Sequence, residues 1–260
     1  MNSALPVLII IMICAGITSD AEGSLMSMMD FRYWRCVMKR QWKCPDSEVN
    51  FFLFTPERPY SQWIDVRHGD LSEYGWKVTR KNVLIVHGFN GTHAKTPISF
   101  LRDAYLSRKD YNVFMVDWSM LARFPCYLSA LANMRLAAQC TAQLYSFMTQ
   151  SGALAKKTTC VGHSLGAHIC GMMSEHLTEK QYKIIGRSRC SHFMSSCYLA
   201  ASIRRRLHII GVPCDNTCPK QGRWGIRYDR KPIVLGDEIP DSTRGMFCAK
   251  VDHDENCPFD

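Results

Sequence analysis

A serine held between two glycines is the feature that most constrains how this chain can fold. The motif G-x-S-x-G spans Gly162 to Gly166, with Ser164 at its centre. A predicted strand over 158–162 precedes it, and a helical pattern over 165–180 follows it. A serine on so tight a strand-to-helix turn needs neighbours without side chains, because the adjoining backbones approach it closely. The pattern therefore predicts a nucleophile elbow, in which Ser164 projects from the end of a sheet.

The rest of the chain alternates apolar runs with helical patterns. The predicted strands cover residues 50–55, 82–86, 111–118 and 158–162, and the predicted helices 97–108 and 126–149. Continuous apolar runs are typical of parallel strands that are buried on both faces. Strands separated by helices predict an α/β fold with a mostly parallel central sheet. We expect the longest helix to pack through its apolar face, formed by Leu128, Leu131, Met134, Leu136, Ala137 and Leu144.

The composition indicates a folded protein of an oxidising compartment. Hydrophobic residues make up 47% of the 260 residues, which excludes a disordered chain. The net charge of +9 includes no long basic run, so no nucleic-acid partner is predicted. Thirteen cysteines are unusual for an intracellular enzyme of this length.

The N-terminal sequence offers a reason for the large number of cysteines. Residues 4–17 form an uncharged apolar run, too short for a comfortable membrane span. We therefore expect a signal peptide over residues 1–20 and an extracellular protein, with an uncleaved anchor as the alternative. Cleavage would remove Cys14 and leave an even number of cysteines for disulfides. We expect local pairs, namely Cys36–Cys44, Cys126–Cys140 and Cys248–Cys257. The cysteine spacing does not predict a zinc site, and neither a metal nor a cofactor is expected.

A second motif supports the first. His87-Gly88-Phe89 follows the predicted strand over 82–86. In a fold with an elbow, the loop after this strand supplies one backbone N–H to the oxyanion hole, and the residue after the serine supplies the other. This assigns the oxyanion hole to the N–H groups of Phe89 and Leu165. The alternative is that His87-Gly88 is an ordinary turn at the end of a strand.

Four segments together resemble the pancreatic-lipase family, and most closely its secreted insect-type neutral lipases and phospholipase A1-like enzymes. They are residues 161–170 (VGHSLGAHIC), 87–90 (HGFN), 116–118 (VDW) and 242–245 (STRG). The resemblance extends from about Cys44 to the end of the chain. It implies an α/β-hydrolase fold and a secreted carboxylic ester hydrolase, with Ser, Asp and His in that chain order. A C-terminal β-sandwich domain is not expected, so residues 21–260 form one hydrolase domain.

The same resemblance points to a catalytic base. Cys190-Ser191-His192 is similar to the C-x-H motif of the family, which makes His192 the expected base for Ser164. The resemblance gives no role to the other histidines, among them His93.

The catalytic acid has no counterpart. His192 follows Ser164 by 28 residues, and no aspartate lies between them. The resemblance implies a G-L-D-P motif with the acid, further strands and a lid, all of which are missing between Arg187 and Ser188. We therefore expect a truncated, incomplete domain and impaired catalysis. Candidate substitutes for the catalytic acid lie only outside the chain order Ser, Asp, His. They are Asp215, Asp229, Asp237 and Asp241.

Two functions follow from these residues. The first is a lipid ester hydrolase of lipase or phospholipase A1 type, with an acylglycerol or phospholipid substrate and peripheral contact with a lipid surface. The alternative is a catalytically inactive lipase-like lipid-binding protein or a truncated isoform. The lid that would discriminate between the two substrates is missing, and the residues predict no particular oligomeric state.

Overall fold

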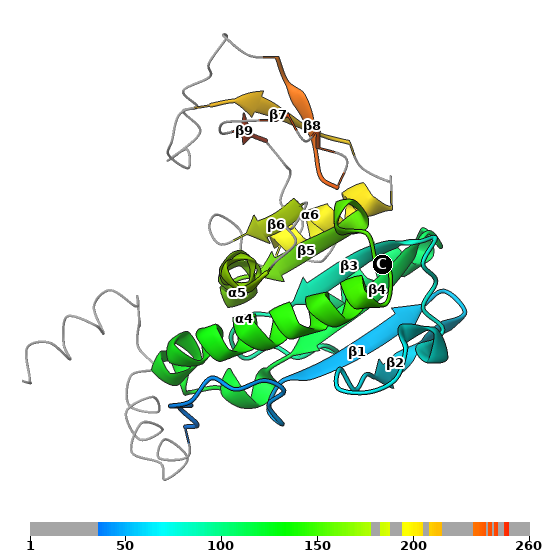
Figure 1. Cartoon of the computed structure of the whole chain (residues 1–260). Helices are drawn as coiled ribbons and strands as arrows, with labels where there is room; N and C mark the ends of the chain where they lie inside the picture. Colours follow the sequence, from blue (N-terminus) through cyan, green and yellow to red (C-terminus); the bar gives the residue numbers. More distant parts are fainter. Residues whose placement is uncertain are drawn as a thin grey trace, which may run out of the picture.

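A six-stranded sheet forms the centre of the protein (Figure 1). The computed structural model describes residues 36–177, 183–187, 194–204, 208–214, 231–237, 239–240, 242–243 and 247–249. The strand order is β2-β1-β4-β3-β5-β6. The strands are β1 (Asn50–Thr55), β2 (Arg58–Trp63), β3 (Lys81–Val86), β4 (Tyr111–Asp117), β5 (Thr158–His163) and β6 (Lys183–Arg187). The four strands from β4 to β6 in this order are parallel, and β1 and β2 complete the sheet in antiparallel pairing. The predicted α/β architecture with a mostly parallel sheet is confirmed.

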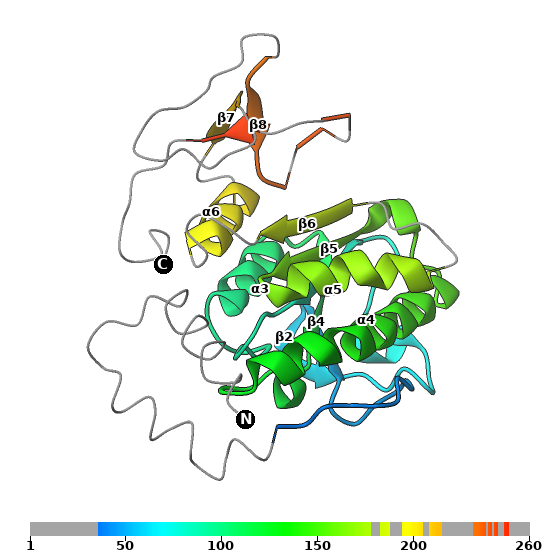
Figure 2. The same ribbon diagram turned by 90° about the vertical axis from the view of Figure 1, so that its left-hand side faces the viewer.

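Two pairs of helices cover the two faces of this sheet (Figure 2). The helices are α3 (Ile98–Ser107), α4 (Tyr127–Gln150), α5 (Leu165–Met173) and α6 (Met194–Ile203). Helices α4 and α5 pack on the face that presents Leu84 and Phe114, whereas α3 and α6 pack on the face of Val83 and Val113. Successive residues of β3 and β4 thus serve opposite cores, which explains the continuous apolar runs Val83–Val86 and Val113–Val116.

The remaining elements are short. They are the 3₁₀ turns η2 (Leu71–Tyr74), η3 (Ser119–Leu121), η4 (Ala155–Lys157) and η5 (Ser174–His176), and a second sheet of order β8-β7-β9 built from β7 (Ile209–Pro213), β8 (Ile233–Leu235) and β9 (Phe247–Cys248). Within the described ranges, no helix combines the length and the hydrophobicity that a membrane crossing requires.

The structure corrects two details of the predicted helices. Helix α5 ends at Met173, and the predicted stretch 178–180 lies outside the described residues. Leu128 is 71% exposed, although we placed it on the inner face of α4. The buried stripe of α4 runs instead through Ala130, Asn133 and Ala137, so Leu128 lies on the other side of the helix.

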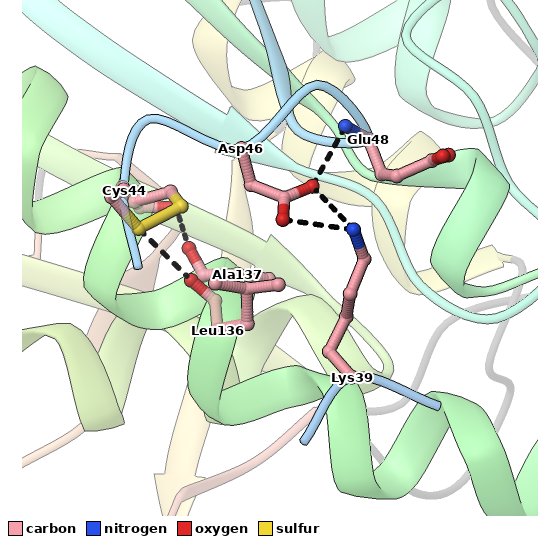
Figure 3. Close-up of a disulfide and its surroundings, with 8 residues drawn as sticks. Lys39, Cys44, Asp46, Glu48, Leu136 and Ala137 are labelled. Atoms are coloured by element: carbon pink, nitrogen blue, oxygen red, sulfur yellow. Dashed lines mark hydrogen bonds and ion pairs between the residues drawn. A yellow bond between two sulfur atoms is a disulfide. The ribbon is translucent and has the colours of Figure 1, made fainter. Parts of the chain in front are cut away.

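The predicted local disulfides Cys36–Cys44 and Cys126–Cys140 are wrong. Cys36 bonds to Cys126 and Cys44 bonds to Cys140, across 90 and 96 residues of sequence. The reason is the path of residues 36–46, which bond to Cys126 just before α4 and to Cys140 within it. Figure 3 shows the disulfide of Cys44. The predicted pair of Cys248 and Cys257 involves a residue outside the described ranges. A further disulfide joins Cys160 of β5 to Cys170 of α5.

Asn133 fastens the same N-terminal segment from inside the protein. Its side chain is buried, and its Nδ2 donates hydrogen bonds to the carbonyl oxygens of Val37 (2.7 Å) and Leu121 (3.2 Å). Its Oδ1 accepts a hydrogen bond from the N–H of Lys39 at 2.9 Å. One buried amide therefore joins α4, the N-terminal segment and the turn that follows β4.

Replacing Asn133 by alanine is expected to lower the free energy of unfolding by about 3 kcal/mol, because it leaves backbone groups of Val37, Leu121 and Lys39 without their partner. Urea denaturation measures this loss. Gln139→Ala on the same helix is the matched control and should change the stability by less than about 0.5 kcal/mol. Equal effects of the two substitutions would contradict the role given to Asn133.

Candidate active site

Ser164 lies between the end of β5 and the start of α5. Its backbone has φ 57° and ψ −123°, a conformation that side-chain-bearing residues rarely adopt. The turn is that tight because helix α5 begins at the very next residue, Leu165. The side chain is half-buried at the carboxyl edge of the parallel strands. A strained serine at this edge is the geometry that the G-x-S-x-G motif requires.

Two glycines make this turn sterically possible. A Cβ atom on Gly166 would overlap the carbonyl oxygen of Val86, at the end of β3. A Cβ atom on Gly88 would lie 2.5 Å from the Cβ of Ser164. Both neighbours are rigid, because one is backbone and the other sits on the strained turn. The glycines thus allow β3, its following loop and the elbow to pack in direct contact.

The loop after β3 is a tight turn beside the serine. The N–H of Gly91 donates to the carbonyl of Gly88 at 3.2 Å, and Asn90 has φ 55°. The N–H of Asn90 donates to the carbonyl of Ala122 at 2.7 Å, which ties the turn to the segment after β4. Phe89 lies within this turn, and its ring packs edge-on against Tyr127 with a centroid distance of 5.0 Å.

Two backbone N–H groups at this place have no acceptor among the described residues: those of Phe89 and Leu165. Leu165 is the first residue of α5, where helix geometry leaves the N–H without an intrahelical acceptor. The positive end of the helix dipole adds to its attraction for negative charge. Ser164, Phe89 and Leu165, which the sequence selected, are therefore brought together at one edge of the sheet.

His87 holds the turn in place. Its side chain is buried, and its Nδ1 donates to the carbonyl of Gly88 at 2.8 Å. Its Nε2 accepts a hydrogen bond from the N–H of Trp118 at 3.1 Å. The indole N–H of Trp118 in turn donates to the carbonyl of His87 at 2.9 Å. Both ring nitrogens of His87 are thus engaged, which suits a structural histidine and leaves none for proton transfer.

An acid–histidine pair that sequence reasoning missed lies at the same edge. The carboxylate of Asp117, at the end of β4, accepts hydrogen bonds from the N–H of His93 (3.0 Å), from its Nδ1 (2.5 Å) and from the N–H of Ser119 (3.0 Å). The ring of His93 stacks on Phe52 at 4.0 Å. The only sequence signal was the position of Asp117 directly at the end of a buried strand.

This pair is too far from the elbow to act as its base. Strand β3 lies between β4 and β5, so the ends of these strands are separated by about 10 Å. The pair instead fixes the loop that continues from Phe89. Burial alone would raise the pKa of Asp117, but the nearby imidazole of His87, whose Nε2 lies 3.5 Å from Oδ1, and the hydrogen bonds from His93 and Ser119 outweigh burial and hold that pKa far below its usual range.

Acid is therefore expected to weaken the fold through Asp117. Because its pKa is depressed in the folded state, the stabilisation is complete above its unfolded value of about 4 and declines as the pH falls below that value. Asp117→Asn should flatten this decline and cost about 2 kcal/mol at neutral pH. Unfolding followed between neutral and acid pH measures both effects. Asp103, whose side chain is 46% exposed, supplies the control substitution, and an unchanged slope in Asp117→Asn would contradict the account.

A family model matches more than half of the chain. The model described as Lipase matches residues 21–188. The chain belongs to the lipase family. The match ends at Ser188, beside the joint where the sequence predicts a missing block. The family resemblance and the α/β-hydrolase fold are thereby confirmed.

Individual lipases and phospholipases align with the same part of the chain. Lipase member H-B of Xenopus laevis is 31% identical over 159 residues, which cover 60% of this chain and 33% of the relative. Phospholipase A1 of Dinoponera quadriceps is 30% identical over 145 residues, covering 52% and 37%. The chain spans about a third of the length of these curated relatives. Among solved structures, a phospholipase/carboxylesterase from Dyadobacter fermentans aligns with 14% identity and a TM-score of 0.34, covering 54% of this chain and 63% of that one.

The lipase acid is not replaced by Asp237. Its two carboxylate oxygens each accept a hydrogen bond at 3.0 Å from a buried tyrosine hydroxyl, those of Tyr105 and Tyr111. Tyr111 opens β4, so Asp237 lies at the amino edge of the parallel strands. Ser164 follows the opposite ends of these strands, about 20 Å away. Burial and the carboxylate raise the pKa of both tyrosines, which keeps them neutral hydrogen-bond donors.

The other expected participants lie outside the described residues. They are the base His192 and the alternative acids Asp215, Asp229 and Asp241. Among the residues that are described, no cluster of three or more His, Cys, Asp or Glu side chains could hold a metal ion.

Proposed function

We propose that this chain is an extracellular lipid ester hydrolase of lipase or phospholipase A1 type, with Ser164 as its nucleophile. The observation that carries the proposal is the strained turn of Ser164 beside two N–H groups without acceptors, on Phe89 and Leu165. Such a place stabilises an alkoxide-like oxygen as it forms. The family match supports a lipid ester as substrate, an acylglycerol or a phospholipid.

In the proposed reaction the Ser164 Oγ attacks the carbonyl carbon of the ester, and its proton passes to His192. The carbonyl oxygen becomes an oxyanion, to which Phe89 and Leu165 donate their N–H groups. The carbon–oxygen bond to the alcohol then breaks, and the alcohol leaves with the proton from His192. Water hydrolyses the acyl-serine by the same route and releases the fatty acid. No metal or cofactor takes part in these steps.

Secretion is supported by two independent features. Residues 4–17 have the composition of a signal peptide, and disulfides join Cys36 to Cys126, Cys44 to Cys140 and Cys160 to Cys170. Disulfides persist in oxidising compartments and are rare in the cytosol.

One observation favours the second candidate function, an inactive lipid-binding protein. No described carboxylate lies within hydrogen-bond reach of the elbow, since Asp117 serves His93 and Asp237 lies at the opposite edge. Without an acid, nothing described orients a histidine toward Ser164 or stabilises its charged form.

Fatty-acid release from mixed triacylglycerol and phosphatidylcholine emulsions tests the proposal. The secreted wild-type protein is expected to release fatty acid slowly, and Ser164→Ala should reduce the release to the level of buffer. Ser174→Ala, an exposed serine just beyond α5, is the matched control and should retain the wild-type rate. A folded wild-type protein without release above buffer would favour the lipid-binding alternative.

A further inference from the structure

We propose that the surface around the start of α4 docks on an anionic phospholipid membrane. This docking surface consists of two segments, residues 38–43 and residues 120–128. The inference rests on the proposed function and deepens it. It names the face of the protein that meets the membrane and the charge of the lipid that attracts this face.

Large apolar side chains point outward from both segments. Phe124 is 64% exposed, Leu128 71% and Met120 50%, all within nine residues. Met38 and Trp42 of the other segment are 55% and 45% exposed. Single exposed apolar residues are common on monomers, but a group of five from adjoining segments marks a binding surface.

The two segments adjoin because covalent and buried polar contacts hold them together. A disulfide joins Cys36, just before the first segment, to Cys126 in the second, with Cα atoms 5.4 Å apart. The buried Asn133 binds the backbone of Val37 and Lys39 on one side and of Leu121 on the other. The docking surface is therefore preformed, and binding would not require the chain to order these segments.

The charged side chains of this surface are mostly positive. No Asp or Glu occurs in residues 36–45 or in residues 118–174. Arg40 and Lys43 are exposed, and the guanidinium of Arg135 lies 5.4 Å above the ring of Trp42. Asp46, which lies beside the first segment, is already paired with Lys39 at 2.9 Å (Figure 3).

This combination fits an anionic membrane better than another protein. Tryptophan and aliphatic side chains insert at the boundary between head groups and acyl chains, while Lys and Arg attract anionic head groups. A second copy of the chain would bring equally positive surfaces together, which like charges oppose. The experiment below also distinguishes a membrane from a protein partner.

The docking surface also adjoins the candidate active site. The segment after β4 contacts the turn of Phe89, since Ala122 accepts a hydrogen bond from Asn90 and the N–H of Phe124 donates to the Asn90 side chain at 3.4 Å. Helix α4 begins at the carboxyl edge of the sheet, where Ser164 lies. A membrane on this surface would therefore meet the protein beside its nucleophile.

Sedimentation with vesicles tests the proposal on the full secreted chain. Vesicles of phosphatidylcholine alone are compared with vesicles of equal parts phosphatidylcholine and phosphatidylserine, and all variants carry Ser164→Ala. Hydrolysis cannot then alter the vesicles, so a failure of binding is distinct from a failure of the proposed reaction. We expect binding to the anionic vesicles that weakens as salt is raised.

Two pairs of variants locate the surface. Arg40→Gln with Lys43→Gln should weaken binding about thirtyfold, since each cation near an anionic surface contributes about 1 kcal/mol. The charge-matched control is Lys156→Gln with Lys231→Gln, two exposed lysines away from the start of α4. Trp42→Ala should weaken binding about tenfold, whereas Trp63→Ala on the exposed edge strand β2 should not.

Several results would overturn the proposal. They are absence of binding, equal binding to both kinds of vesicle, and equal losses in the test and control variants. A concentration-dependent dimer that Trp42→Ala abolishes would assign the surface to a second copy. A protein recovered only through the same residues, without any affinity for vesicles, would assign it to a protein partner.

Discussion

Alanine at position 166 is expected to prevent the elbow from folding, whereas alanine at position 171 is expected to stabilise the protein. Both glycines lie in α5, so the two substitutions add the same methyl group to the same helix. At Gly166 the new Cβ would overlap the carbonyl oxygen of Val86, a backbone atom of the central strand β3. At Gly171 nothing lies within 4 Å of the new atom.

The expected free energies of unfolding differ in sign. Gly166→Ala should cost about 3 kcal/mol or more, because neither β3 nor α5 can move without disturbing the core. Gly171→Ala should add about 0.5–1 kcal/mol, because alanine restricts the unfolded chain and favours the helix. Thermal and urea denaturation of the secreted proteins measure both. A Gly166→Ala protein as stable as the wild type would show that helix and strand are not packed as described.

The second large effect concerns the rate of hydrolysis. We expect this chain to hydrolyse a soluble short-chain ester about 10⁴-fold more slowly than a lipase with a complete triad, because the acid normally fixes the histidine tautomer and stabilises its charged form. The two N–H groups of Phe89 and Leu165 are expected to retain part of the catalysis. Comparison of kcat/KM with that of a full-length family member measures the difference. A rate within tenfold of that enzyme would mean that a carboxylate outside the described residues acts as the acid.

The parallel strands and the elbow could be predicted from the sequence because local patterns determine them. Strands β3 and β4 serve two cores at once, so each has a continuous run of four apolar residues. The G-x-S-x-G motif specifies its own backbone, since only glycines admit the approach seen at Gly166. Strand β2 was missed because its sequence, RPYSQW, is mostly polar and its residues are mostly exposed at the edge of the sheet.

Features that depend on contacts between distant residues could not be predicted in this way. The disulfides join residues 90 and 96 positions apart, and the path of the N-terminal segment along α4 decides these pairs. The pairing of His93 with Asp117 depends on how the loop after β3 folds back over the end of β4. The exposure of Leu128 was missed because small and polar residues, Ala130 and Asn133, form the buried stripe beside it.

The sequence and the structure both bear on the lack of a catalytic acid. The sequence predicts that a block is missing between Arg187 and Ser188, and the family match ends at Ser188. The described residues add that Asp237 lies at the wrong edge of the sheet and that Asp117 is committed to a loop. The strained turn of Ser164 is therefore present, whereas the carboxylates of Asp117 and Asp237 are engaged elsewhere.

Covalent labelling of Ser164 tests the central claim most directly. The secreted protein is treated with a fluorophosphonate, which reacts with activated serines, and the modified residue is located by mass spectrometry of the disulfide-reduced digest. The account predicts one adduct, on Ser164, that is absent in Ser164→Ala and present in Ser174→Ala. A folded wild-type protein that stays unlabelled, or that is labelled on another residue, would contradict it.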